Sequence, residues 1–132
     1  MQDLINQGLK DCPEAIKFYA GEIICFLQVA HKEKEIIHTR INPRNCLIAK
    51  NLHLKISYFQ NALFIKDTNM NVYDSQENFK LPDINEGLEY ISPECIEERI
   101  QTRAMDLWAL GCLLFEMATG RKAFKGSSKA EL

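Results

Sequence analysis

The sequence lacks the features of several large classes of protein. Its formal net charge is only -2 at pH 7, and no long run carries one sign of charge. Neither nucleic acid nor an anionic membrane is therefore an expected partner. The first residues have no basic segment followed by an apolar core, and no apolar run reaches the roughly 20 residues of a membrane span. We expect no signal peptide and no transmembrane segment, and a cytoplasmic or nuclear location.

Cysteine is present in an odd number, five, and no two cysteines form a C-x-x-C pair. This pattern is typical neither of a disulfide framework nor of a zinc site. We expect free thiols in a reducing compartment, with Cys25 and Cys112 in helical core patterns. With 132 residues, 46% hydrophobic and 26% charged, the chain has the composition of one globular domain.

The most apolar stretch is residues 102–120, whose hydrophobic side chains cover nearly every face of a helical wheel. Such a helix is predicted to be buried on all sides. Thr102 is placed to cap its N-terminus, and Gly120 is placed to end it in the left-handed conformation. Its apolar members are Met105, Leu107, Trp108, Leu110, Cys112, Leu113, Leu114, Phe115, Met117 and Ala118.

Asp106 lies near the first turn of this predicted core helix, where a buried carboxylate needs hydrogen-bond donors. One interpretation is that the helix's own N-terminal amides stabilise it. The other is that it anchors the backbone of a different loop. The pattern alone favours the first interpretation.

Two further helices are predicted outside this segment. Residues 11–31 carry one apolar stripe, with Asp11 as the cap, Pro13 in the first turn and Glu14 in a capping box. Residues 93–98 should form a short helical turn.

Short strands are expected between these helices, and residues 58–86 read as a long loop around one of them. A capping-box pattern near the C-terminus predicts the start of another helix. The expected strands are residues 36–37, 46–49, 52–56 and 62–65, with the second and third forming a hairpin, and the capping box is residues 128–131.

The order of motifs resembles the C-terminal lobe of a serine/threonine protein kinase, with closest likeness to the AGC group. The motifs are His38-Thr39-Arg40-Ile41-Asn42-Pro43-Arg44-Asn45, Tyr58-Phe59-Gln60, Ser92-Pro93-Glu94 and Asp106-Leu107-Trp108-Ala109-Leu110-Gly111. The resemblance implies an α+β, mainly α fold with small β-hairpins around a central buried helix. Residues 1–132 are then expected to be a partial kinase-like domain, in which the N-terminal lobe and the final helices are missing.

The resemblance also shows where the catalytic loop departs from the family. The family loop reads H-R-D-L-K-P-E-N, and Pro43 and Asn45 fix the register here. The aspartate that accepts the substrate hydroxyl proton corresponds to Arg40, a cation that cannot act as a base. The family's arginine corresponds to Thr39, and the lysine that steadies the transferring phosphate corresponds to Asn42.

Of the positions that bind metal and nucleotide in the family, some are kept here and others are replaced. Asn45, a metal and backbone ligand in the family, is retained, and Leu47 corresponds to a residue next to the adenine ring. Tyr58, however, replaces the aspartate of D-F-G that holds Mg²⁺, and a neutral phenol is a poor ligand for a hard dication. Asp83 lies where many kinases carry a phosphothreonine and could mimic its charge, but the arginine that would pair with it corresponds to Thr39.

Other matching positions are structural in the family. Asp106 holds the catalytic-loop backbone near His38, and the ring of His38 stacks with Phe59, so the resemblance moves the interpretation of Asp106 toward the anchor. Glu94 pairs with a distant arginine in the family, or is solvated here. The remaining structural positions are Trp108, Leu113 and Met117, the last two continuing a hydrophobic spine from Leu47.

Two functions follow from the resemblance. The first is a non-catalytic, pseudokinase-type module that binds a protein partner or regulates one, with no cofactor expected. The alternative is a serine/threonine kinase that uses ATP and Mg²⁺, read here as an incomplete or divergent chain. If further helices are absent, some of Leu107, Leu110, Leu114 and Phe115 should lie near the surface. Self-association or a protein partner would then use that apolar surface.

Overall fold

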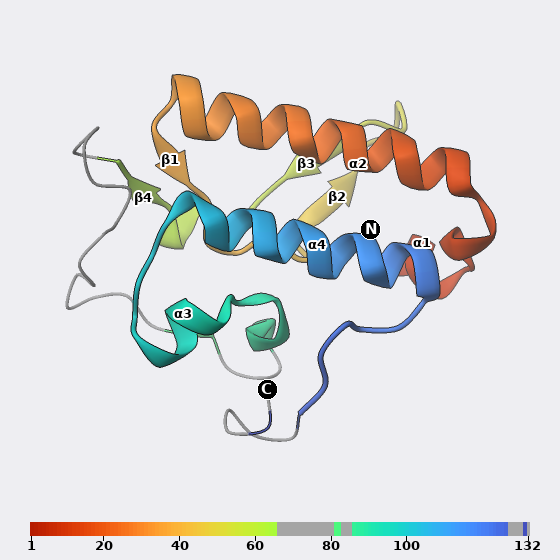
Figure 1. The fold of residues 1–132 in the computed structure, drawn as a ribbon. Coiled ribbons are helices and arrows are strands. Elements are labelled where there is room, and N and C mark those ends of the chain that lie inside the picture. The colour runs from red at the N-terminus through yellow and green to blue at the C-terminus, as the bar shows by residue number, and fades with distance from the viewer. Residues whose placement is uncertain (66–80, 83–85, 127–130, 132) are drawn as a thin grey trace.

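The computed structural model describes residues 1–65, 81–82, 86–126 and 131, and its helices form most of the fold (Figure 1). The α-helices are α1 (Gln2–Asn6), α2 (Pro13–Gln28), α3 (Pro93–Glu97) and α4 (Arg103–Thr119). Shorter helical turns are η1 (Leu9–Asp11), the π-helical η2 (Val29–Glu33), η3 (Phe59–Asn61) and η5 (Leu88–Tyr90). The strands are β1 (Ile36–Ile37), β2 (Cys46–Ile48), β3 (Leu54–Ile56) and β4 (Leu63–Phe64). The expected α+β, mainly α fold class is confirmed.

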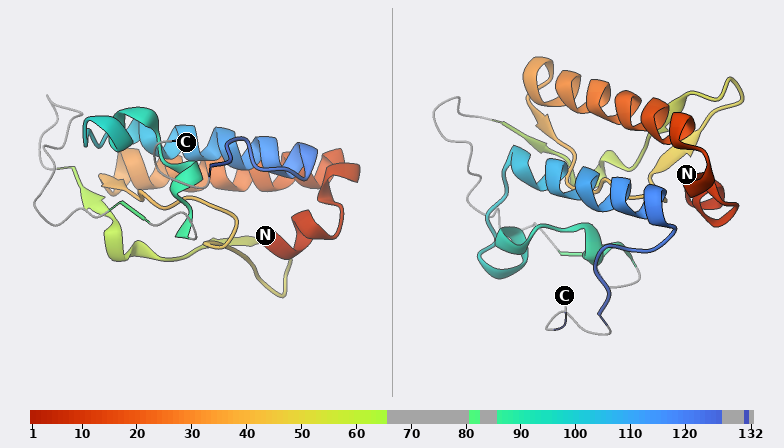
Figure 2. Two further views of the ribbon diagram at one scale, coloured as in Figure 1. Left: turned by 90° about the horizontal axis from the view of Figure 1, so that it is seen from below. Right: turned by 45° about the vertical axis from the view of Figure 1, so that its right-hand side comes forward.

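Helices α2 and α4 lie side by side and run in opposite directions, and the strands lie on one side of this pair (Figures 1 and 2). The apolar stripe of α2 faces the core, as its spacing predicts. Buried members of the main core include Tyr19, Ile23, Leu27, Ile41, Cys46, Tyr90, Leu110, Leu113 and Met117.

Two small antiparallel sheets support the loop that follows β1. Strands β2 and β3 form the predicted hairpin, with Leu47 opposite Lys55. Strand β1 pairs with β4, with Ile36 opposite Phe64, so a distant strand closes the other end of the loop. The loop between Ile37 and Cys46 is therefore held at both ends by sheet hydrogen bonds.

The ends of α4 are as predicted. The Thr102 hydroxyl accepts a hydrogen bond from the Ala104 amide at 3.1 Å, and Gly120 takes a left-handed φ of 70°. Burial on all sides is wrong, because Leu107 is 56% exposed and Phe115 47% exposed. Within the described residues, the rest of the chain packs on one side of α4 and leaves these two side chains open. Leu114 is half-buried beside them.

The predicted start of α2 is also wrong in detail. Asp11 lies in η1, where its amide donates to the Gly8 carbonyl at 3.0 Å, so it cannot take the extended conformation of a cap. Cys12 is the N-cap and makes no side-chain capping bond. Cys25 is exposed rather than in the core, because it faces away from the buried stripe of the helix, whereas Cys112 is buried as expected.

The N-terminal segment adds elements that no motif predicted. Helix α1 and η1 bring Met1, Ile5 and Leu9 into the main core. No helix in the described part of the chain has the length and hydropathy needed to cross a membrane. Asp83 and most of the capping box at residues 128–131 lie outside the described residues.

Candidate functional site

The carboxylate of Asp106 organises the loop between β1 and β2. Its Oδ2 accepts a hydrogen bond from the His38 amide and its Oδ1 one from the Thr39 amide, both at 2.8 Å. The side chain is buried, with only 1% exposed. Because both amides belong to a different element, these contacts are those of the anchor interpretation rather than of a carboxylate stabilised only by its own helix.

His31 completes the environment of this carboxylate and was not predicted to be near it. Its Nε2 lies 2.8 Å from Oδ2 of Asp106, and the imidazole is almost buried. In the sequence, His31 is only the last residue of the helix expected over residues 11–31. The available signal was its position directly after the apolar Ala30, with which it is buried in the π-helical turn η2 that follows α2.

The His38 ring has a defined set of contacts. Its Nε2 lies 3.0 Å from the Ser57 carbonyl, and since a carbonyl can only accept, Nε2 carries the proton. Nδ1 then accepts from the Arg40 amide at 3.3 Å. Burial lowers the pKa of His38 below its ordinary value, which favours this neutral form. The ring meets Phe59 edge-on at 4.8 Å between centroids, and Phe26 lies against both rings.

Thr39 and Arg40 are the residues that the resemblance aligns with the family's arginine and aspartate. Thr39 has a left-handed φ of 68°, and its hydroxyl donates to the Asn61 carbonyl at 3.0 Å. Arg40 is buried, and its Nη1 donates to the Thr39 carbonyl at 3.2 Å. Burial lowers the pKa of the Arg40 guanidinium. Arg40, which the resemblance aligns with the catalytic aspartate, is therefore a buried cation.

Asn42 and Asn45 close the loop through backbone contacts. Oδ1 of Asn42 accepts from the amides of Arg44 at 3.0 Å and Asn45 at 3.1 Å, which makes an Asx-type turn. Nδ2 of Asn45 donates to the Arg40 carbonyl at 2.8 Å. Both asparagines thus hold the loop in shape, and Asn42 supplies no positive charge where the family has lysine.

Tyr58 lies at the end of the β2–β3 hairpin in a left-handed conformation, with φ 72° and ψ 59°. Its side chain and that of Phe59 are each about half exposed. Within the part of the chain that the structure describes, no three His, Cys, Asp or Glu side chains converge as a metal-binding group.

The spine residues are only partly brought together. Leu113 and Met117 are fully buried in the main core. Leu47 is 49% exposed, because alternation along β2 turns it to the opposite face from the buried Cys46. The structure therefore does not pack Leu47 into a continuous core with the other two.

The two remaining structural positions lie away from the loop. Trp108 stacks on Phe124 with centroids 5.4 Å apart, and Glu94 is half-buried in α3. The main-chain carbonyl of Glu94 accepts from the amides of Glu98 and Ile100.

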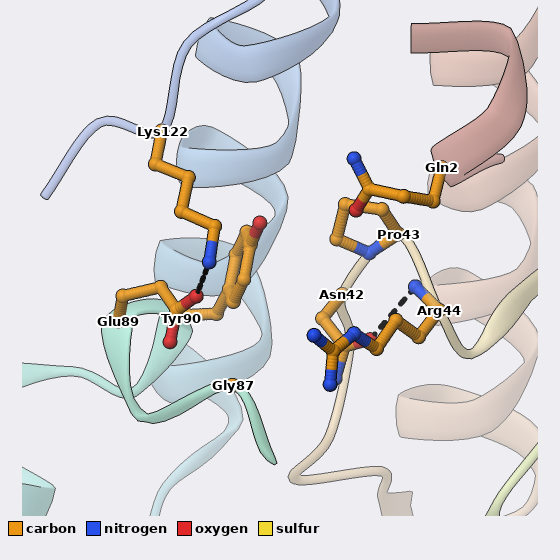
Figure 3. Close-up of a pocket in the computed structure, with 8 residues that line it drawn as sticks. All are labelled: Gln2, Asn42, Pro43, Arg44, Gly87, Glu89, Tyr90 and Lys122. Atoms are coloured by element: carbon orange, nitrogen blue, oxygen red, sulfur yellow. Dashed lines mark hydrogen bonds and ion pairs between the residues drawn. The ribbon is translucent and has the colours of Figure 1, made fainter. Parts of the chain in front are cut away.

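A pocket beside the loop was not predicted (Figure 3). On one side Lys122 forms an ion pair with Glu89, and the buried Tyr90 hydroxyl donates to Glu116. Burial and the adjacent Glu116 raise the pKa of Tyr90. The pocket is lined by Gln2, Asn42, Pro43, Arg44, Gly87, Glu89, Tyr90 and Lys122.

Comparison with known proteins gives the family directly. The family model of the protein kinase domain matches residues 1–132 of the chain. The chain belongs to the protein kinase family. It is 32% identical over 113 residues to 3-phosphoinositide-dependent protein kinase B of Dictyostelium discoideum, which covers 86% of this chain and 12% of that protein. The predicted resemblance to AGC-type serine/threonine kinases is thereby confirmed.

Other relatives in the protein kinase family give the same result. The chain is 31% identical to the serine/threonine-protein kinase PKH1 of Saccharomyces cerevisiae, over 86% of this chain and 15% of that protein. It is 32% identical to the cAMP-dependent protein kinase catalytic subunit of Dictyostelium discoideum, over 91% of this chain and 16% of that protein. The chain therefore spans less than a fifth of the length of each of these relatives.

Proposed function

We propose that this chain is a non-catalytic member of the protein kinase family, a pseudokinase-type module that acts through protein contacts. The observation that carries the proposal is Arg40. It stands where the family places the carboxylate that accepts the substrate proton, and a guanidinium has no free lone pair to accept one. Its buried position and its bond to the Thr39 carbonyl fit it to hold the loop.

The donor set for Mg²⁺ supports the same proposal. Mg²⁺ prefers carboxylate and phosphate oxygens in octahedral geometry. The corresponding positions offer the Tyr58 phenol and the Asn45 amide, and Nδ2 of Asn45 already donates to the loop backbone. These neutral groups do not fit the ion, and the position of the family's phosphate-binding lysine holds the buried, neutral Asn42.

The hydrogen bonds that shape the loop support a structural or regulatory role. Asp106 still holds the loop to α4, the His38 ring holds it to Ser57 just after β3, and Asn45 closes it internally onto the Arg40 carbonyl. A chain that keeps the loop's shape but has neither the aspartate that accepts the substrate proton nor the D-F-G carboxylate that holds Mg²⁺ is suited to recognition rather than phosphoryl transfer. The free cysteines suit a reducing compartment, so we place this action in the cytoplasm or nucleus.

The alternative is that the chain is part of a serine/threonine kinase that transfers the γ-phosphate of ATP with Mg²⁺. The names of its relatives favour this alternative, since each is described as a protein kinase. In that case Arg40 and Tyr58 would have to be replaced in function by residues elsewhere.

Incubation with labelled ATP, Mg²⁺ and generic protein substrates tests the proposal. We expect no phosphate transfer above that of a preparation carrying Asn45→Ala, which controls for contaminating kinases. Transfer by the wild-type chain that is lost in Asn45→Ala would overturn the proposal and establish the alternative.

A further inference from the structure

We draw no further inference here: the strongest candidate, the pocket beside the loop in which Oε2 of the buried Glu89 has no hydrogen-bond partner among the described residues, belongs to the candidate site already described, and nothing in the structure shows which ligand would fill it.

Discussion

Replacing Asp106 with alanine should strongly destabilise the fold. The carboxylate accepts from two loop amides at 2.8 Å and lies 2.8 Å from Nε2 of His31, so Asp106→Ala leaves buried polar groups without their partner. Each unsatisfied buried group costs about 1 to 3 kcal/mol. We expect a loss of about 3 to 5 kcal/mol, measured by urea unfolding with circular dichroism, against a total stability of about 5 to 15 kcal/mol for a typical domain.

The chain offers a matched control for this experiment in Glu14. Like Asp106, Glu14 is an acid in the first turn of a long helix, but it is exposed and pairs with the equally exposed Lys17. Glu14→Ala removes the same favourable interaction with the helix dipole and should cost at most about 1 kcal/mol. If Asp106→Ala costs no more than Glu14→Ala, the carboxylate is stabilised by its own helix and does not anchor the loop.

Three further predictions concern the loop and the pocket. Burial holds the pKa of the His38 imidazole below its ordinary value of 6.5. As pH falls, His38 of the unfolded chain is therefore protonated before His38 of the folded chain, and the free energy of unfolding should decrease below about pH 6.5. In thermal melts across this pH range, His38→Gln should show a smaller decrease. Tyr90→Phe leaves the buried Glu116 without its hydroxyl partner and should lower the free energy of unfolding, measured by urea titration, by about 1 to 3 kcal/mol. An unchanged free energy of unfolding would show that this hydrogen bond does not contribute to stability. Gly87→Ala should lower the melting temperature and reduce the free energy of unfolding by about 1 to 3 kcal/mol, because φ is +101° at Gly87 and the new Cβ would lie 3.1 Å from Nδ2 of Asn42. An unchanged melting temperature would contradict this.

The sequence predicts those elements whose signals are local. Helix α4 has a capping threonine, an apolar body and a terminal glycine, so its bounds are found correctly. The β2–β3 hairpin likewise follows from two apolar runs separated by turn formers. The start of α2 is misplaced because a 3₁₀ turn competes for Asp11, and the sequence alone does not say which hydrogen bonds win.

The features that could not be predicted from the sequence depend on long-range contacts. The pairing of β1 with β4 and the contact of His31 with Asp106 join residues far apart in the chain, and neither has a periodic signature. The exposure of Leu107 depends on which elements cover α4, which its own helical pattern cannot specify. The family resemblance supplied the register of the loop, and the structure then supplied the contacts of its altered residues.

A thermal-shift titration with ATP, in the presence and absence of Mg²⁺, tests the central claim most directly. A ligand that binds only the folded chain raises its melting temperature in proportion to the logarithm of its concentration above Kd. With Tyr58 at the position of the D-F-G metal ligand and Arg40 at the position of the catalytic base, we expect no Mg²⁺-dependent shift at any ATP concentration. A shift that requires Mg²⁺ and disappears in Asn45→Ala would contradict the account of this chain as a non-catalytic member of the protein kinase family.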